Sequence, residues 1–129
     1  MRVLLIEDCP DDEVRSLAAL QATEMPLNVT VAHNSGDAKK SLEESGPWDI
    51  VLVDFRLPGS IDGVTLAELA MELYPDARVA MLTGLPEAAS RALKDNRILV
   101  FGKDIFLRGH VAALVHDASI QPGTLYAVG

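Results

Sequence analysis

The chain has 129 residues, 49% of them hydrophobic and 23% charged, a composition typical of one globular domain with a buried core. No apolar run approaches the roughly 18 residues that a membrane-spanning helix needs, and two acids interrupt the N-terminal apolar run before it could serve as a secretory signal, so we expect a cytoplasmic protein. The net charge of −8 disfavours direct nucleic-acid binding, and the single cysteine, Cys9, excludes an internal disulfide and a multi-cysteine metal site.

Five short apolar segments, rich in β-branched residues and bounded by polar residues, glycine or proline, are predicted as strands. They lie at residues 2–6, 27–32, 50–53, 77–82 and 97–101. Amphipathic segments between the strands predict helices. The first helix begins at Pro10, the second opens at Ser35, the third closes at Tyr74-Pro75, and the last spans about 106–119.

This alternation predicts a doubly wound α/β domain. Nearly continuous hydrophobic strands separated by amphipathic helices are typical of a parallel sheet covered on both faces, because right-handed crossovers place the helices over the sheet. The segment at 27–32 is the most polar, with Asn28 and Thr30 in alternation, and therefore suits an edge. The predicted strand order is 2-1-3-4-5, with residues 1–120 forming the domain and 121–129 a tail or the start of a linker.

Polar residues stand at the carboxyl ends of the predicted central strands. Glu7 and Asp8 follow the first strand, Asp54 ends the third, Thr83 follows the fourth and Lys103 follows the fifth. In an open parallel sheet, ligands bind beyond the carboxyl ends of the strands, where the winding direction reverses. We therefore expect the three acids, the hydroxyl and the amine to meet in one crevice.

An acid cluster of this kind predicts a divalent cation and phosphoryl chemistry. Neighbouring carboxylates repel unless their pKa values rise or a cation holds them together. Mg²⁺ prefers oxygen ligands and retains several waters, so it matches two carboxylates and a main-chain carbonyl, which Arg56 is placed to offer. Asp54 could then attack phosphorus to form an acyl phosphate, with Lys103 and Thr83 sharing the charge on the phosphoryl oxygens.

Four motifs carry a resemblance to the receiver domains of two-component response regulators, over nearly the whole chain. They are LLIED with the acidic pair, DIVLVDFRLPGSIDG with Asp54, VAMLTG with Thr83 and VFGKD with Lys103. The resemblance implies a flavodoxin-like fold in which Asp54 accepts a phosphoryl group from a phosphohistidine. It also implies that Asp8, with Glu7 acting through water, holds Mg²⁺, and that Thr83 and Lys103 bind the phosphoryl oxygens.

The resemblance implies partners as well. The phosphoryl group would come from a sensor histidine kinase or a phosphotransfer protein, and the signal would pass to a downstream protein or effector domain. A phosphorylation-dependent homodimer is compatible with such a switch. The only chemistry implied is self-catalysed phosphorylation and dephosphorylation of Asp54, so we do not expect an enzyme that acts on a separate substrate.

The sequence departs from the family pattern around Lys103. Asp104 stands where the family usually has proline, and a cis bond before a non-proline residue costs about 2.5–4 kcal/mol. We therefore expect a trans bond, and a partial neutralisation of Lys103 by Asp104. Val100 stands where the family has an aromatic switch residue, and Phe101 lies on the opposite strand face.

Other functions compete with that of a phosphorylated switch. A pseudo-receiver, an interaction module with this fold whose output does not depend on phosphate, is favoured by the altered lysine loop and the missing aromatic residue but disfavoured by the intact acids. A haloacid-dehalogenase-type phosphatase needs a second aspartate two residues after the nucleophile, where Arg56 stands. A flavin-binding relative needs a Ser/Thr/Gly-rich loop after the first strand, where the chain has EDCPDDE.

The site residues also have structural interpretations. Asp54 could cap the turn that follows it, Thr83 could cap the next helix, and Lys103 could be a solvated surface residue. The acids at 11–13 are better explained as residues that complement the helix dipole than as ligands. The three histidines share no metal-ligand spacing, and Trp48 is predicted to be a packing residue.

Overall fold

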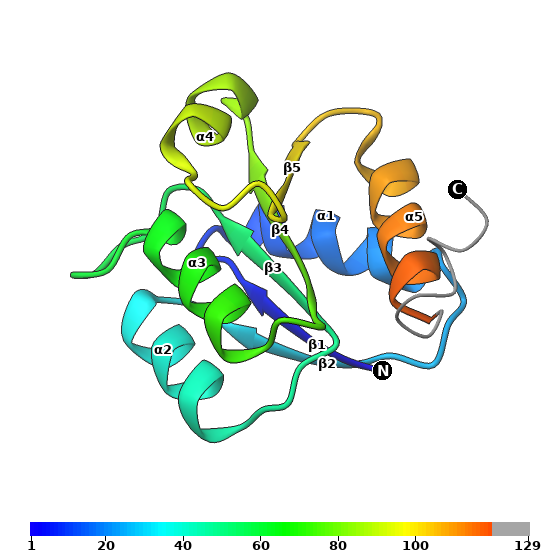
Figure 1. Cartoon of the computed structure of the whole chain (residues 1–129). Coiled ribbons are helices and arrows are strands. Elements are labelled where there is room, and N and C mark those ends of the chain that lie inside the picture. The colour runs from blue at the N-terminus through cyan, green and yellow to red at the C-terminus, as the bar shows by residue number, and fades with distance from the viewer. Residues whose placement is uncertain (120–129) are drawn as a thin grey trace.

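The computed structural model describes residues 1–119 as alternating strands and helices (Figure 1). The strands are β1 (Arg2–Ile6), β2 (Asn28–Ala32), β3 (Ile50–Asp54), β4 (Arg78–Thr83) and β5 (Leu99–Gly102). The helices are α1 (Pro10–Gln21), α2 (Ser35–Glu44), α3 (Gly63–Leu73), α4 (Pro86–Ala92) and α5 (Leu107–Ser119). All five predicted strands form, with small shifts at their ends, and none of the described helices is long and apolar enough to cross a membrane. The predicted tail, 121–129, lies outside the described residues.

The strands form one parallel sheet in the predicted order β2-β1-β3-β4-β5. β2 is an edge strand, and β1 lies between β2 and β3. In the register of β1 with β3, Ile6 is opposite Val53, so the residues that follow them leave the sheet side by side. The winding direction reverses between β1 and β3, which places the ligand crevice expected for this fold beyond the ends of these two strands.

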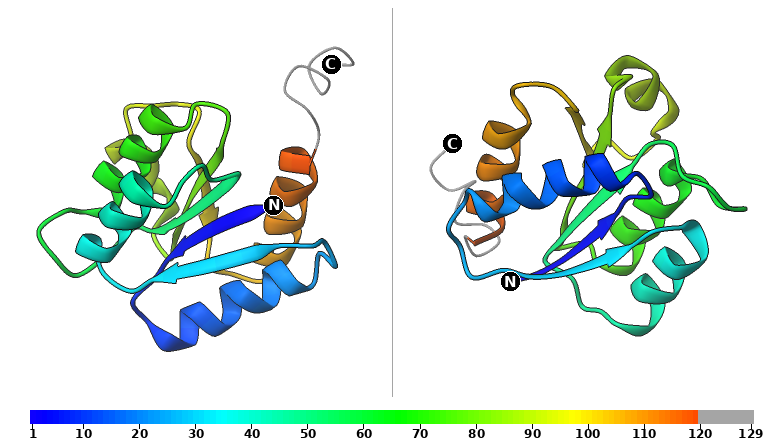
Figure 2. Two further views of the ribbon diagram at one scale, coloured as in Figure 1. Left: turned by 90° about the horizontal axis from the view of Figure 1, so that it is seen from below. Right: turned by 180° about the vertical axis from the view of Figure 1, so that it is seen from behind.

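Helices cover both faces of the sheet (Figure 2). α2 and α3 pack on one face, against side chains that include Leu4 and Ile6 of β1. α1 and α5 pack on the other face, against side chains that include Val3 and Leu5 of the same strand. Because alternate side chains of a strand point to opposite faces, both sets must be apolar, and this explains why the central strands are hydrophobic throughout.

Local signals set where the first three helices begin. Pro10 is the first residue of α1, where its missing N–H leaves no helical hydrogen bond unmade. The side chains of Asn34 and Asp62 cap α2 and α3, since each accepts a hydrogen bond at 2.8 Å from a backbone N–H, that of Asp37 and that of Thr65 respectively. These caps fix the helix starts near the carboxyl ends of the strands.

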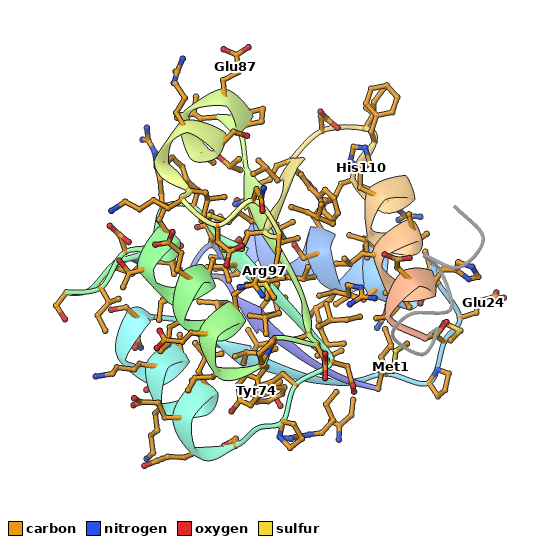
Figure 3. All side chains as sticks on the ribbon, viewed as in Figure 1. Met1, Glu24, Tyr74, Glu87, Arg97 and His110 are labelled. Atoms are coloured by element: carbon orange, nitrogen blue, oxygen red, sulfur yellow. The ribbon has the colours of Figure 1, made fainter. Side chains whose placement is uncertain are left out.

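Aromatic side chains pack at the opposite end of the sheet. Trp48, just before β3, is 3% exposed, and its indole N–H donates to the Ser41 carbonyl at 3.1 Å. The Arg2 guanidinium lies 4.4 Å from the centre of the Trp48 ring. Tyr74, which follows α3, donates its hydroxyl to the Leu42 carbonyl of α2 (Figure 3). Trp48 is therefore a packing residue, as predicted.

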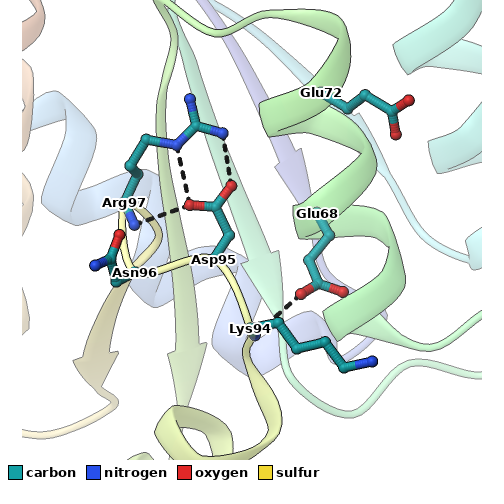
Figure 4. A pocket seen from close by; sticks show the side chains of 6 residues that line it. All are labelled: Glu68, Glu72, Lys94, Asp95, Asn96 and Arg97. Atoms are coloured by element: carbon teal, nitrogen blue, oxygen red, sulfur yellow. Dashed lines mark hydrogen bonds and ion pairs between the residues drawn. The ribbon is translucent and has the colours of Figure 1, made fainter.

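Helix α4 is short, with seven residues. The segment between α4 and β5 is held by two polar contacts (Figure 4). Arg97 donates twice to the Asp95 carboxylate, at 3.0 and 2.7 Å, and the Lys94 backbone N–H donates to the Glu68 carboxylate of α3 at 3.1 Å. Hydrogen bonds from the Arg97 side chain lower the pKa of the Asp95 carboxyl to about 2. The bond to Glu68 ties this segment to α3, and the Asp95–Arg97 contact holds its own turn.

Candidate functional site

Three carboxylates meet at the carboxyl ends of β1 and β3. Glu7 and Asp8 directly follow β1, and Asp54 is the last residue of β3. One oxygen from each of the three lies within 4.8 Å of the others. Glu7 is fully buried and Asp54 is 7% exposed, whereas Asp8 is exposed. The structure therefore brings the three predicted acids together, with the solvent reaching them from the Asp8 side.

Lys103 lies directly over this acid cluster. Its backbone N–H extends the pairing of β5 with β4, because it donates to the Thr83 carbonyl at 2.9 Å. Its ammonium donates to Glu7 Oε2 at 3.1 Å and to Asp54 Oδ1 at 3.0 Å. A third hydrogen bond runs to Asp12 Oδ2 at 2.8 Å. The side chain is only 13% exposed, so Lys103 is part of the site and not a solvated surface residue.

Burial and charge act against each other in this cluster. Burial, together with the neighbouring Asp54 charge, raises the pKa of Glu7 to about 7, although Lys103 partly offsets both effects. Burial also raises the pKa of Asp54, against the hydrogen bond and charge of Lys103. For Lys103, burial opposes the charged form, but its hydrogen bonds to Asp12 and Asp54 outweigh burial and raise its pKa above the ordinary value. One ammonium does not fully compensate the three acids of the cluster.

Thr83 and Arg56 both lie beside the acid cluster, but they differ in burial and in the groups that make their contacts. Thr83 is 3% exposed, and its Oγ1 accepts a hydrogen bond from the Leu85 N–H at 2.8 Å, which supports the turn into α4. The hydroxyl hydrogen of Thr83 is not used by that bond, so it can still donate. Arg56 is exposed, and its backbone N–H bonds to the Asp54 carboxylate and lowers the pKa of Asp54. The role predicted for the Arg56 carbonyl as a metal ligand stays a prediction.

Asp12 is a site residue that the sequence analysis did not identify. We expected the acids at 11–13 only to complement the dipole of the first helix, and Asp12 does lie in the first turn of α1. Its carboxylate nevertheless makes the shortest of the three contacts with the Lys103 ammonium. No local pattern marks it, since Asp11 and Glu13 have the same chemistry one position away.

Asp104 does not neutralise Lys103, and that expectation is wrong. The ammonium of Lys103 contacts Glu7, Asp12 and Asp54, whereas Asp104 accepts a hydrogen bond from the Phe106 N–H at 2.8 Å. The Asp104 side chain folds back toward its own backbone and supports the turn before α5. The bond between Lys103 and Asp104 is trans, as expected.

Phe101 faces away from the acid cluster, as the strand alternation predicted. It packs with α5 on the face that also holds Val111, and its ring stacks on that of His110 with ring centres 5.1 Å apart. Figure 3 labels His110 on α5. Val100, at the position where an aromatic switch was expected, is half-buried beside Pro86 and Arg91 of α4. No aromatic ring therefore stands on that face of β5.

The fold and the site together define a class: a doubly wound α/β domain with acids and a lysine at its strand tips. The response regulator receiver protein CpdR of Brucella abortus (strain 2308) is 31% identical over 102 residues, which cover 76% of this chain and 82% of CpdR. The chain therefore belongs to the response regulator receiver proteins of two-component signalling. The sensor protein TorS of Escherichia coli (strain K12) is 36% identical over 75 residues, but these are only 8% of TorS. The chain matches no family model.

Solved structures agree with this fold. A response regulator receiver protein from Sinorhizobium medicae WSM419 superposes with a TM-score of 0.78 over 92% of this chain and 94% of that chain, at 17% identity. A response regulator protein from Burkholderia pseudomallei, described with a phosphorylated aspartic acid, calcium ion and citrate, superposes with a TM-score of 0.66 at 26% identity, over 92% of this chain and 68% of that chain. The predicted flavodoxin-like fold is confirmed.

Proposed function

We propose that this chain is a phosphoacceptor switch in which Asp54 receives a phosphoryl group from a sensor histidine kinase or a phosphotransfer protein. The observation that carries the proposal is the Lys103 ammonium, which is hydrogen-bonded to Asp54 inside a cluster of three carboxylates. The Burkholderia neighbour, whose description names a phosphorylated aspartic acid and a calcium ion, supports it. The modified domain would present an altered surface to a downstream protein or effector domain, in the cytoplasm.

The transfer is a nucleophilic displacement at phosphorus. A carboxylate oxygen of Asp54 forms a bond to phosphorus as the bond between phosphorus and the donor imidazole nitrogen breaks, and the electron pair leaves with that nitrogen. The product is an acyl phosphate, and attack by water on it returns the carboxylate and inorganic phosphate. Lys103, already in contact with Asp54, donates to the phosphoryl oxygens, and the free hydroxyl hydrogen of Thr83 adds a second donor. The protein thus catalyses only its own modification.

The residues present fit a hard divalent cation such as Mg²⁺. Three carboxylate oxygens converge within 4.8 Å of one another, and burial raises the pKa of Glu7 and Asp54, so a cation that stabilises their charged forms would be favoured there. An oxygen-only ligand set is the one that Mg²⁺ prefers. Asp8, Asp54, the Arg56 carbonyl and Glu7, the last through water, would hold the ion. When bound, it supplies positive charge that neutralises the phosphoryl oxygens.

Thr83 links the phosphoryl site to the start of α4. Its Oγ1 accepts from the Leu85 N–H, in the turn just before Pro86 opens the helix. Phosphorylation adds negative charge beside Thr83 and Lys103, so both side chains would reorient toward it. A shift of the Thr83 hydroxyl would then be transmitted to α4 through the Leu85 turn. This gives the switch a defined output element.

The test is phosphorylation by a small donor. The protein is incubated with Mg²⁺ and acetyl phosphate, and its intact mass is measured. We expect one added phosphoryl group on the wild type and on Asp11→Asn, a control that removes an exposed acid outside the cluster. Asp54→Asn should carry none, because it lacks the nucleophile. Absence of the adduct on the wild type, at any donor concentration, contradicts the proposal.

A pseudo-receiver is the second candidate function. It is favoured by one observation: Phe101 faces α5 while Val100 occupies the position next to α4, so no aromatic side chain of β5 could couple Thr83 to that surface. A pseudo-receiver would bind its partner equally well before and after acetyl phosphate treatment. Absence of both the phosphoryl adduct and Mg²⁺ binding would favour this candidate over the switch.

A further inference from the structure

The three partners of Lys103 fall into two groups. Glu7 and Asp54 belong to the acid cluster whose oxygens could hold a cation. Asp12 lies outside that cluster, on α1, and makes the shortest contact, 2.8 Å from its Oδ2 to the ammonium. We propose that Asp12 is a positioning residue that keeps the Lys103 ammonium beside Asp54 when a cation engages the acid cluster, a proposal that rests on the function proposed above.

Lys103 needs such an anchor because its own loop packs poorly. A free lysine side chain loses rotamer entropy when it is held in one place. The loop that follows it offers little packing to hold it, since Ile105 is 89% exposed and Phe106 is 62% exposed. The backbone hydrogen bond to Thr83 fixes the position of the Lys103 main chain. The position of the ammonium depends on the hydrogen bonds that the ammonium itself makes. Side-chain partners therefore decide the position of the charge.

A cation bound in the acid cluster would affect the three partners of Lys103 differently. Carboxylate oxygens of Glu7 and Asp54 that bound a cation would make weaker hydrogen bonds to the ammonium, and the cation and the ammonium would repel each other. Of the three carboxylate contacts of Lys103 within residues 1–119, Asp12 would then be the one that a cation in the cluster does not share. The Asp12 side chain is 25% exposed and that of Lys103 is 13% exposed, so solvent screens the pair only in part.

The geometry of Asp12 suits this role. Its Oδ2 faces Lys103, while its Oδ1 is 4.0 Å from the exposed guanidinium of Arg15, one turn further along α1. An ammonium has three N–H donors. One can stay on Asp12 while the others turn from the carboxylate of Asp54 to a phosphoryl oxygen carried by it. Asp12 thus acts on the phosphoryl group only through Lys103.

The first experiment observes the ammonium itself. Proton exchange of lysine side-chain ammonium groups is measured by NMR on ¹⁵N-labelled protein at saturating Mg²⁺, in the wild type, Asp12→Asn and Asp11→Asn. The Lys103 signal is identified by its absence in Lys103→Ala, and the exposed Lys39, Lys40 and Lys94 serve as internal references. We expect exchange at Lys103 to be at least about tenfold faster in Asp12→Asn, because one charge-assisted hydrogen bond is lost. Asp11→Asn, with the same charge change in the same helical turn, should match the wild type.

The second experiment measures phosphorylation of the same variants by acetyl phosphate at saturating Mg²⁺. The rate constant at saturating donor should fall about tenfold in Asp12→Asn, with the Mg²⁺ concentration for half-saturation nearly unchanged, and Asp12→Glu should recover part of the rate. Unchanged exchange, an unchanged rate, or an equal loss in Asp11→Asn overturns the proposal. Faster ammonium exchange in Asp12→Asn with no adduct on the wild type refutes the phosphoacceptor function but supports the anchoring of Lys103.

Discussion

Both carboxylate oxygens of Glu7 accept hydrogen bonds, yet the charged form of Glu7 is destabilised. Its Oε1 accepts from the Cys9 N–H at 3.2 Å and its Oε2 accepts from Lys103 at 3.1 Å. Burial nevertheless dominates, and with the nearby Asp54 charge it raises the pKa of Glu7 to about 7. The folded protein therefore holds a proton on Glu7 at a pH where the unfolded chain has released it. In the absence of a cation, ionising Glu7 works against folding.

This predicts a pH dependence of stability in metal-free buffer. Because the pKa of Glu7 is raised from 4.5 to about 7, its stabilising contribution is complete below 4.5 and is lost as the pH rises through about 7. Glu7→Gln has no proton to lose there. Its free energy of unfolding should therefore increase relative to that of the wild type between about pH 4.5 and about pH 8, as measured by urea titration at each pH.

The control for this prediction is Glu43→Gln, which removes an exposed carboxylate on α2. Its difference from the wild type should stay constant over the same range. A constant difference for Glu7→Gln as well would show that Glu7 ionises alike in the folded and unfolded states, in conflict with its burial.

At the scale of elements, the first turn of α3 is packed directly onto the end of β3. Asp62 caps this helix, and Gly63 follows it as a buried residue. A side chain at Gly63 would overlap the backbone carbonyl of Asp54 and would lie 3.0 Å from that of Phe55 and 3.1 Å from Met81 Cε. The glycine is needed here for close approach, since the backbone that carries Asp54 leaves no room for a Cβ.

Gly63→Ala should therefore lower the free energy of unfolding by about 1–3 kcal/mol, the usual cost of overpacking. It should also slow phosphorylation by acetyl phosphate, because relief of the overlap moves the Asp54 backbone. Stability is measured by urea denaturation and the rate by intact mass. Gly109→Ala in α5 is the matched control, since a Cβ there meets nothing within 4 Å. It should gain roughly 0.5–1 kcal/mol through helix propensity, and equal effects of the two substitutions would contradict the packing argument.

At the scale of the whole molecule, stability and cation binding are linked. The chain carries a net charge of −8. Three carboxylates cluster at the ends of β1 and β3, and a fourth, that of Asp12 at the start of α1, shares the Lys103 ammonium with two of them. Self-repulsion of this kind destabilises a compact state. A divalent cation that binds only the folded state would add RT ln(1 + [L]/Kd) to the free energy of unfolding.

We predict that Mg²⁺ raises the thermal unfolding temperature of the wild type by several degrees. At a concentration of about 100 times its Kd the gain is about 2.7 kcal/mol. Asp8→Asn should remove most of the shift, because Asp8 is the exposed acid of the cluster and makes no hydrogen bond or ion pair through its side chain among the described residues. Asp11→Asn should retain it, and chelation of the ion should reverse it. An equal shift for Asp8→Asn, by differential scanning calorimetry, would point to weak binding elsewhere on the acidic surface.

The sequence by itself determined the elements, their order and the crevice. Strand and helix periodicities are local, and continuous apolar strands such as β3 require two covered faces, so the parallel sheet and its order followed. The convergence of Glu7, Asp8, Asp54 and Lys103 followed from the same reasoning, because parallel strands end at one edge. Their chemical roles in phosphoryl transfer stay predictions.

Only the tertiary structure decided which partners the Lys103 ammonium has. Asp12 is 91 positions away in the chain, and its contact depends on how α1 packs beside the loop after β5, which no local pattern encodes. The adjacent Asp104 was expected to neutralise Lys103. Its carboxylate instead accepts a hydrogen bond from the Phe106 N–H, because this backbone donor lies two residues away in the same turn. Sequence neighbours compete for local hydrogen bonds, whereas a flexible ammonium takes the partners that packing brings to it.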